Sequence, residues 1–398
     1  MQHIKLRIPF DLGTYEEPFM EFPRKVPFIL EYDDKELLIR EKITRNIRTY
    51  LKKYYEKGGY GSTPLGQGDY GKRQGDELFD VISGMLTEES KNIHDMNFLE
   101  IGSSYGYLLY LLKQHGARDV LGVEPGDEGV IGGKKYGVPF IQDFFPTKRL
   151  TRKFDCILSH AVLEHVEKPD EFVSEIYDTL AGGGCTFIAV PDSEKKMLVG
   201  DPSVLTHQHV NYFTKYSLQI LLQRIGFSRI KVWSSDKRSI LYGWGVKAAD
   251  GRRIPNETAT GDHDGEIFSA FDRNVKKNIS SIQKLLTERE KRGRTVGLYA
   301  PSIVLDGLLS FSKEPRLFDT DEMKHGRFMA GFKNRIESPL NLVDHPVDVL
   351  FIAPVDYDTE IRSYLKSILP HTEKTEIISL KKIYEENSGV RYAVGSVA

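Results

Sequence analysis

Cysteine is scarce in this sequence, with only Cys156 and Cys185 among 398 residues. Both occur in apolar runs typical of buried strands, so we predict reduced core thiols rather than a disulfide. Unpaired buried thiols suit a reducing compartment. No apolar run reaches transmembrane length, and the start, MQHIKLRIPFDLG, lacks the apolar core of a signal peptide. We therefore expect a cytoplasmic protein without membrane insertion.

An excess of either charge is also absent, because 55 Lys and Arg stand against 57 Asp and Glu, for a net charge of -2. This balance gives no general attraction to nucleic acid or to anionic lipid. Hydrophobic residues make up 40% of the 398 residues. A chain of this length is too long for one ordinary core, so we expect a soluble protein of two or three domains.

What is present is a repeated alternation of elements. From about Asn97, short apolar runs alternate with amphipathic segments, which predicts a mostly parallel sheet with helices on both faces. A long helix is predicted over 265–292, after a polar, broken segment. A second, smaller alternating unit follows, with a helix over 302–311. The expected parts are an N-terminal extension, an α/β domain, a linker with the long helix and a C-terminal α/β domain, over residues 1–85, 86–248, 249–292 and 293–398.

The N-terminal extension combines a charged, helix-like stretch at 35–56 with a glycine-rich segment at 58–75. Seven glycines predict a loop over 58–75. The loop is either an ordinary connection or a lid over a pocket. Tyr70, Lys72 and Arg73 are its candidate substrate contacts, although a solvated loop explains the basic pair equally well.

The strongest chemical signal is FLEIGSSYGYLL, where a strand turns through Gly102 and Gly106 into a helix. Glycine at these places allows a tight turn and a close approach of a ligand to the backbone, and the helix start favours polar or anionic ligand groups. Glu124 follows the next strand, where a carboxylate can accept two hydrogen bonds from a ribose diol. The turn therefore predicts a nucleoside-containing ligand at the carboxyl ends of the strands.

A nicotinamide cofactor is the first alternative ligand. Its binding turn normally reads GxGxxG, but here Ser104 replaces the middle glycine and the pattern is ExGxxxG. The close approach that a diphosphate needs is less well provided. The acid before the turn, Glu100, suits a cofactor with a cationic amino-acid part.

At this point the chain resembles a known family. LEIGSSYGYLL, GVEP, DFFP, FDCILSHAVLEHVEKPDEFV, TLAGGG and HVNYFTKYSLQILLQRIGF together are similar to class I S-adenosylmethionine-dependent methyltransferases, and most similar to the C-methyltransferases of nucleotide-linked deoxysugars. The resemblance covers about residues 60–245 and extends more weakly to the end. It implies a Rossmann-like methyltransferase domain, an N-terminal helical and loop extension, and a second, smaller Rossmann-like domain.

The resemblance implies that S-adenosylmethionine is the cofactor and a sugar or nucleotide-linked sugar the substrate. The residues expected to line the methionine part are Glu100, Gly102, Ser104 and Gly106. Those expected around the ribose and adenine are Glu124, Pro125, Asp143 and Phe144. His160 and Ala161 are expected to face the sulfur.

Two departures from the family matter. The family begins with a cysteine-rich zinc-binding module, whereas here no cysteine precedes Cys156. The turn GLYAPS of the second domain lacks the second glycine of a nucleotide turn, so we do not expect it to bind a dinucleotide. The domain would hold the nucleotide end of the substrate or form the platform of a homodimer.

Two histidines stand in THQHVNYFT, where the family reads tyrosine-histidine-glutamate-histidine. His209 matches the second family histidine and is the expected general base, with His207 in reserve and Asn211 as a substrate contact. Thr206 and Gln208 replace the tyrosine and the glutamate. Gln208 cannot act as a base, and a hydroxyl acceptor needs only one neutral histidine. The sequence therefore favours O-methylation slightly over C-methylation.

Other interpretations of these residues stay open. The two histidines share one face of an extended segment, but no Cys or carboxylate lies close by in sequence, so no metal is expected. His165, in LEHV, is expected to cap or pack a helix. A catalytically inactive scaffold is the remaining alternative, and the retained Glu100, Gly102, Glu124 and both histidines argue against it.

Overall fold

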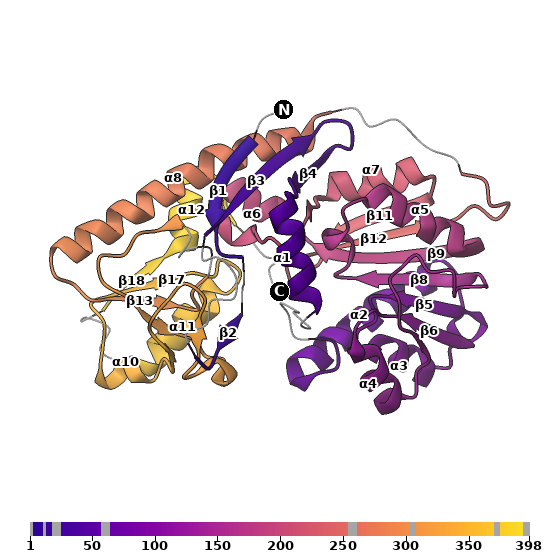
Figure 1. The fold of residues 1–398 in the computed structure, drawn as a ribbon, viewed down its shortest axis with the longest axis horizontal. Helices are drawn as coiled ribbons and strands as arrows, with labels where there is room; N and C mark the ends of the chain where they lie inside the picture. Colours follow the sequence, from indigo (N-terminus) through magenta and orange to yellow (C-terminus); the bar gives the residue numbers. More distant parts are fainter. Residues whose placement is uncertain are drawn as a thin grey trace.

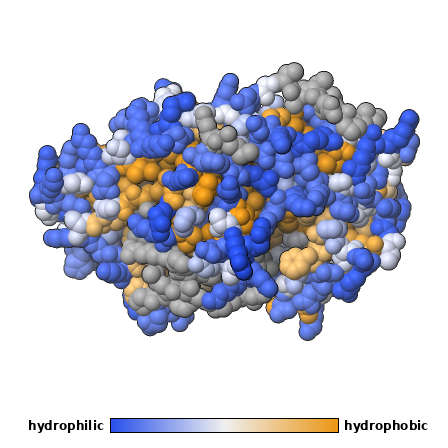
Figure 2. All heavy atoms as spheres, turned by 45° about the horizontal axis from the view of Figure 1, so that its top comes forward, coloured by the Kyte–Doolittle hydropathy of each residue, from blue (hydrophilic) through white to orange (hydrophobic). Residues whose placement is uncertain are grey.

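The structure is a computed structural model that describes residues 3–10, 13–17, 25–56, 64–253, 261–302, 304, 308–369 and 375–392. Figure 1 shows two large sheets at opposite ends of the molecule, with the N-terminal strands and α1 (Arg45–Glu56) between them. The face turned forward in Figure 2 is mostly hydrophilic, with apolar side chains gathered near its middle. No helix in the described ranges is long and apolar enough to cross a bilayer.

The central sheet has seven strands in the order β11-β12-β9-β8-β5-β6-β7. Its strands are β5 (Asn97–Ile101), β6 (Asp119–Val123), β7 (Phe140–Ile141), β8 (Phe154–His160), β9 (Leu180–Pro191), β11 (Ser228–Ser234) and β12 (Ile240–Val246). The pairs from β7 to β9 are parallel, whereas β12 runs antiparallel to both β9 and β11. The expected mostly parallel α/β fold is confirmed.

Helices cover both faces of this sheet because alternate strand residues are apolar in both directions. Leu99 and Ile157 face α5 (Pro169–Thr179) and α7 (Lys215–Ile225). Their neighbours Phe98 and Leu158 face α2 (Gly68–Glu88) and α3 (Tyr107–Gln114). In the layer with α5 and α7, side chains of strands and helices form one continuous core. Helix α4 (Asp127–Tyr136) follows β6. Both cysteines are buried and free in the layer with α2 and α3, as predicted.

The C-terminal sheet has five parallel strands in the order β16-β14-β13-β17-β18. Its strands are β13 (Val296–Tyr299), β14 (Arg316–Phe318), β16 (Ile336–Glu337), β17 (Val349–Ile352) and β18 (Glu376–Ser379). The C-terminal half of α8 (His263–Lys291) and α12 (Leu380–Ser388) cover one face, while α10 (Asn341–Asp344) and α11 (Asp358–Ile368) cover the other. The helix predicted over 302–311 lies partly outside the described residues.

The N-terminal extension contains a sheet as well as the expected helix. Strands β1 (His3–Ile8), β3 (Val26–Asp33) and β4 (Leu38–Glu41) pair in order, and β4 then pairs with β10 (Asn211–Tyr212). The helix predicted over 35–56 therefore begins only at Arg45. Asp33 accepts hydrogen bonds from the amides of Lys35 and Glu36, and this local turn competes with a helix there.

The loop predicted over 58–75 is also wrong in its second half, because α2 begins at Gly68. Glycines 71 and 75 lie on the buried face of this helix. A Cβ on Gly71 would lie 2.3 Å from the carbonyl oxygen of Pro64, and one on Gly75 would lie 2.5 Å from Tyr107. These glycines permit close packing rather than a loop. Residues 58–63 of the predicted loop lie outside the described residues.

A buried polar pair joins the N-terminal sheet to the segment that carries the two histidines. The Nδ1 atom of His207 lies 2.6 Å from Oε1 of Glu41, and both side chains are 0% exposed. Burial raises the pKa of Glu41 to about 9 and lowers the pKa of His207 to about 3. Both side chains are therefore uncharged at neutral pH, with a protonated carboxyl group beside a neutral imidazole.

This pair makes a stability prediction. Glu41→Leu should lower the free energy of unfolding by about 1–3 kcal/mol, because it leaves a buried ring nitrogen of His207 without its partner. Glu41→Gln keeps a polar partner and should cost less. Urea unfolding of both variants measures the difference, with exposed Glu360→Leu as the control. Equal losses for Leu and Gln would contradict the role of this hydrogen bond.

Candidate active site

The glycine turn predicted from the sequence lies at the carboxyl edge of the central sheet. Strand β5 ends at Ile101, and Gly102 then takes a φ of 69°, in the left-handed region that favours glycine. A Cβ on Gly102 would lie only 2.3 Å from Cγ2 of Val162, in the segment after β8. Only glycine therefore lets these two strand ends meet. The turn brings the segments after β5 and β8 into one site.

Two carboxyl groups flank this turn. Glu124 is 3% exposed, and its two oxygens accept hydrogen bonds from the amides of Ser104 and Gly126, each at 2.8 Å. Glu100 is 2% exposed, and its Oε2 has no hydrogen-bond partner among the described residues. Burial, followed by the nearby Glu124, raises the pKa of Glu100 well above its usual range. A ligand with cationic and hydrogen-bond-donating groups fits this pair, since it would satisfy the orphan oxygen and relieve the like-charge repulsion.

The residues expected around the adenine and the sulfur stand at the ends of two strands of the central sheet, β7 and β8. Asp143 follows β7, and its carboxylate accepts hydrogen bonds from the Phe144 amide and the Thr147 hydroxyl. These bonds lower the pKa of Asp143, that from Thr147 most. The ring of Phe144 is 73% exposed, so it is available to a planar ligand. Pro125 is half-buried beside Glu124.

The end of β8 carries the two residues expected to face the sulfur. Burial, and then the charge of Arg238, lower the pKa of His160 to about 4, so this ring is neutral at neutral pH. Ala161, exposed, takes a φ of 54°, where the chain turns away from the sheet. Ser104 has a similar φ of 46° in the glycine turn. Backbone turns of this kind cluster at functional sites.

The candidate substrate contacts from the glycine-rich segment all lie in α2, but their side chains have different surroundings. Tyr70 is 45% exposed, and its ring lies 5.2 Å from the guanidinium of Arg238, in the turn between β11 and β12. Lys72 and Arg73 are exposed on the helix surface. The structure thus brings Tyr70 toward the residue that influences His160, and leaves the basic pair in solvent.

The segment THQHVNYF places its side chains in different surroundings. His207 is fully buried against Glu41, so it is closed to a substrate. Gln208 is also buried, and its Nε2 donates to the carbonyl of Phe10 at 3.0 Å. The amide of Asn211 donates to the carbonyls of Leu163 and Val166, which uses both of its hydrogens. Of these polar residues, only His209 keeps a partly exposed side chain.

His209 has a neighbour that the sequence did not reveal. The ring of His165 lies 5.1 Å from the ring of His209 in an edge-on arrangement. Glu164 is buried beside them, and its Oε1 lies 3.8 Å from Nε2 of His165. Burial, followed by His165, lowers the pKa of His209 to about 3, so this histidine is neutral and can accept a proton. The sequence favoured a capping or packing role for His165 over a catalytic one, without knowledge of these two neighbours.

The signal that could have found His165 is its distance from the strand end. Glu164 and His165 belong to a short 3-10 turn, η2 (Leu163–His165), that directly follows β8 and Val162. Val162 occupies the space that Gly102 leaves open. Ligands bind outside the carboxyl ends of strands in this kind of sheet. His165 therefore follows, by three residues, the residue that contacts the glycine turn, and His209 lies beside His165.

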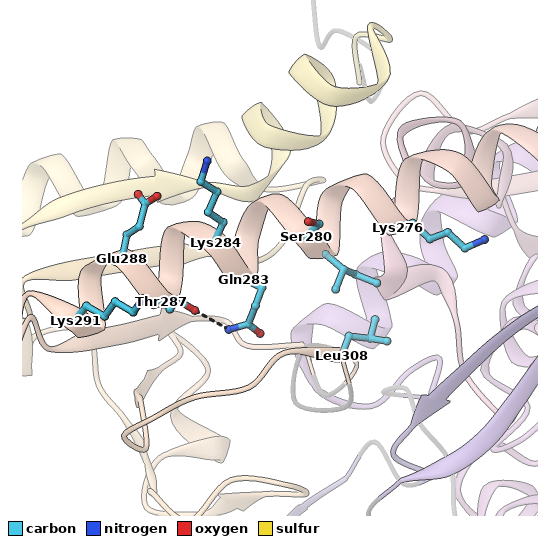
Figure 3. Close-up of a pocket in the computed structure, with 9 residues that line it drawn as sticks. Lys276, Ser280, Gln283, Lys284, Thr287, Glu288, Lys291 and Leu308 are labelled. Carbon is cyan, nitrogen blue, oxygen red and sulfur yellow. Dashed lines mark hydrogen bonds between the residues drawn. The ribbon is translucent and has the colours of Figure 1, made fainter.

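A separate groove of about 670 Å³ runs along α8 and is lined by charged and polar side chains with Ile279 and Leu308 (Figure 3). Gln283 and Thr287 are hydrogen bonded within it at 3.3 Å. Residues 305–307, which adjoin Leu308, lie outside the described ranges. None of the residues that line the groove belongs to the glycine turn or to the histidine pair.

Family models match two parts of the chain. Residues 70–232 match the family model of a methyltransferase domain, and residues 247–378 match that of a C-methyltransferase C-terminal domain. The C-methyltransferase NovU of Streptomyces niveus is 23% identical over 291 residues, which cover 68% of this chain and 69% of the relative. A tRNA U34 carboxymethyltransferase of Hydrogenovibrio crunogenus is 26% identical over 159 residues, or 36% of this chain and 47% of the relative.

Solved structures are more distant. A 1,6-didemethyltoxoflavin-N1-methyltransferase of Burkholderia thailandensis is 15% identical with a TM-score of 0.39, and the match covers 58% of this chain and 99% of that one. A magnesium protoporphyrin IX methyltransferase of Synechocystis PCC 6803 is 17% identical with a TM-score of 0.39, covering 50% and 100%.

The α/β fold with its glycine turn and the two matching family models define an enzyme that transfers methyl groups. The chain belongs to the class I S-adenosylmethionine-dependent methyltransferases and is related to the C-methyltransferases. The nicotinamide-dependent and the inactive-scaffold alternatives lose their support.

Glu124 gives a test of the cofactor site. Glu124→Ala should weaken binding of S-adenosylmethionine by on the order of 1–3 kcal/mol, because a buried hydrogen-bond acceptor is lost. Titration calorimetry measures the affinity, and thermal unfolding reports the separate loss of the two amide bonds. Glu128→Ala, which removes the same charge four residues further on, is the matched control. Unchanged affinity in Glu124→Ala would remove this residue from the cofactor site.

Proposed function

We propose that this enzyme transfers a methyl group to a nucleotide-linked sugar, with the donor bound at the glycine turn between Glu100 and Glu124. S-adenosylmethionine, when bound, supplies a methyl group on a positively charged sulfur. The buried, unpartnered oxygen of Glu100 supports this site, because the donor carries the cationic groups that such an oxygen would attract. The acceptor class rests on the resemblance to sugar C-methyltransferases, and the matching C-methyltransferase C-terminal domain model supports the relation to C-methyltransferases.

The observation that carries the proposal is the pairing of His165 with His209 beside the end of β8. Methyl transfer is an in-line displacement, so the protein must orient the acceptor, exclude water and accept one proton. His209 is neutral and partly exposed, and we assign it the role of general base. His165 orients it, since its Nδ1 is fixed at 2.6 Å from the carbonyl of Gln208 in the same segment.

The choice between carbon and oxygen as the acceptor atom depends on Gln208 and Glu164. The sequence favoured oxygen because Gln208 replaces the family's glutamate. In the structure the amide of Gln208 faces Phe10, away from the histidine pair, so the substitution says little about the reaction. Glu164 instead provides a carboxyl group beside both histidines. We therefore propose C-methylation next to a sugar carbonyl, where a base removes the carbon-bound proton and the resulting enolate attacks the methyl group.

O-methylation is the second candidate. It is favoured by the low pKa of His209, because a hydroxyl gives up its proton only as its oxygen attacks and needs less basicity than a carbon acid.

Product analysis tests the proposed function. Nucleotide-linked keto sugars and their hydroxyl counterparts are incubated with the enzyme and a methyl donor labelled with ¹³C, and products are examined by mass spectrometry and NMR. A methyl signal coupled to a sugar carbon, with loss of that carbon's proton, is the expected result. A methoxy signal would support the second candidate, and no transfer to any activated sugar would overturn the substrate class.

His209→Ala should reduce kcat by roughly 10²–10⁴-fold, the usual contribution of a positioned base, while affinity for S-adenosylmethionine stays within about twofold. Radiolabel transfer and calorimetry measure the two quantities. His263→Ala, at the exposed start of α8, is the control that removes a histidine elsewhere. Full activity in His209→Ala would end the assignment of this residue as the base.

A further inference from the structure

We propose that Glu164, His165 and His209 form a binding site for a divalent transition-metal ion. Zinc is the ion that we expect to bind there. One ligand atom from each of the three side chains lies within 4.8 Å of the other two. The sequence predicted no metal because no carboxylate lies near His209 along the chain. The fold supplies one, since η2 brings Glu164 from 45 residues upstream against the histidine segment.

The carboxyl group of Glu164 is the first independent sign of a missing ligand. Glu164 is 1% exposed, and its Oε2 has no hydrogen-bond partner among the described residues. A buried polar atom without a partner is costly in a folded protein, and a bound ion is one of the recognised ways to satisfy it. The side chain cannot turn to solvent without leaving the core. The same carboxyl group has its other oxygen, Oε1, 3.8 Å from Nε2 of His165, so the group with the unsatisfied atom belongs to the cluster.

The orientation of His165 is the second sign. Its Nδ1 lies 2.6 Å from the carbonyl oxygen of Gln208, so this nitrogen carries the hydrogen and donates it. The lone pair is then left on Nε2, which is the atom that lies 3.8 Å from Glu164. Histidines that bind metals are typically held in this way, with the second nitrogen donating to a carbonyl or carboxylate. The tautomer required for coordination is therefore already fixed.

Two imidazoles and one carboxylate are a ligand set that suits zinc and related ions. Ligand atoms around a tetrahedral zinc lie about 3.4 Å apart, given bonds of about 2.1 Å. The three ligand atoms, which lie within 4.8 Å of one another, would have to approach by up to about 1.4 Å to bind one ion. The partly exposed face of His209 leaves the fourth position open to water.

Metal binding has a consequence that rests on the proposed function. A lone pair of His209 cannot both hold an ion and accept a proton from the acceptor. Zinc bound at this site therefore inhibits methyl transfer, and its removal restores activity.

Direct binding tests the site independently of catalysis. The full chain is treated with chelator, dialysed and titrated with zinc, and bound metal is quantified. Cobalt binding is followed in parallel by visible absorption. One equivalent of zinc is expected, and Glu164→Gln and His165→Gln should each weaken it by about tenfold or more. Glu164→Gln is close in shape, and thermal unfolding with cofactor titration verifies that each variant is folded.

His263→Ala is the matched control, because Nε2 of His263 lies 3.6 Å from a carboxylate oxygen of Glu194 but belongs to no three-ligand cluster in the described structure. Its zinc affinity should equal that of the unaltered chain. Equal zinc binding by the unaltered chain and by folded Glu164→Gln and His165→Gln would overturn the metal site, and so would the absence of stoichiometric binding. Zinc that binds at the site without slowing transfer would support the metal site and instead overturn His209 as the base.

Discussion

The backbone of Val210 fixes the geometry on which the active site depends. Its carbonyl accepts a hydrogen bond from the amide of Glu41 at 2.8 Å, and its amide donates to the carbonyl of Glu164 at 2.7 Å. One peptide segment thus joins the N-terminal sheet to the turn after β8. His209 precedes Val210, so its distance from His165 follows from these two bonds. The antiparallel pairing of β4 with β10 continues the same connection.

The glycine turn could be predicted from sequence because its chemistry is local. A strand, a glycine with positive φ and a helix start follow each other within ten residues, and the next strand end supplies Glu124 at a fixed interval. The alternation of apolar runs likewise predicted the central sheet and the C-terminal sheet. In both cases the deciding interactions join residues of neighbouring elements, which is the range over which residue patterns carry information.

The features that sequence could not give depend on long-range pairing. Strand β4 reads as the start of a helix, although it pairs with β3 just upstream and with β10 about 170 residues later. The glycines of α2 suggest a loop in the sequence. They are needed because Pro64 and Tyr107 pack closely against the helix, and the sequence pattern does not show this contact. His165 and His209 are 44 residues apart, and only the packing of η2 against β10 brings them together. The side chain of Gln208 faces Phe10 instead of the histidine pair. Its presence in place of the family's glutamate therefore says little about the methylated atom.

Helix α8 has one more implication for how this molecule moves. Its first turns pack through Phe271 and Val275 on the N-terminal sheet, and its last turns pack through Ile282 and Leu286 on the C-terminal sheet (Figure 1). A rod of 29 residues without proline transmits displacement along its axis rather than absorbing it. Helix α8 also contacts β4, and β4 pairs with β10 shortly after His209. A shift of the C-terminal sheet along this helix would therefore reach the strand that adjoins the histidine segment.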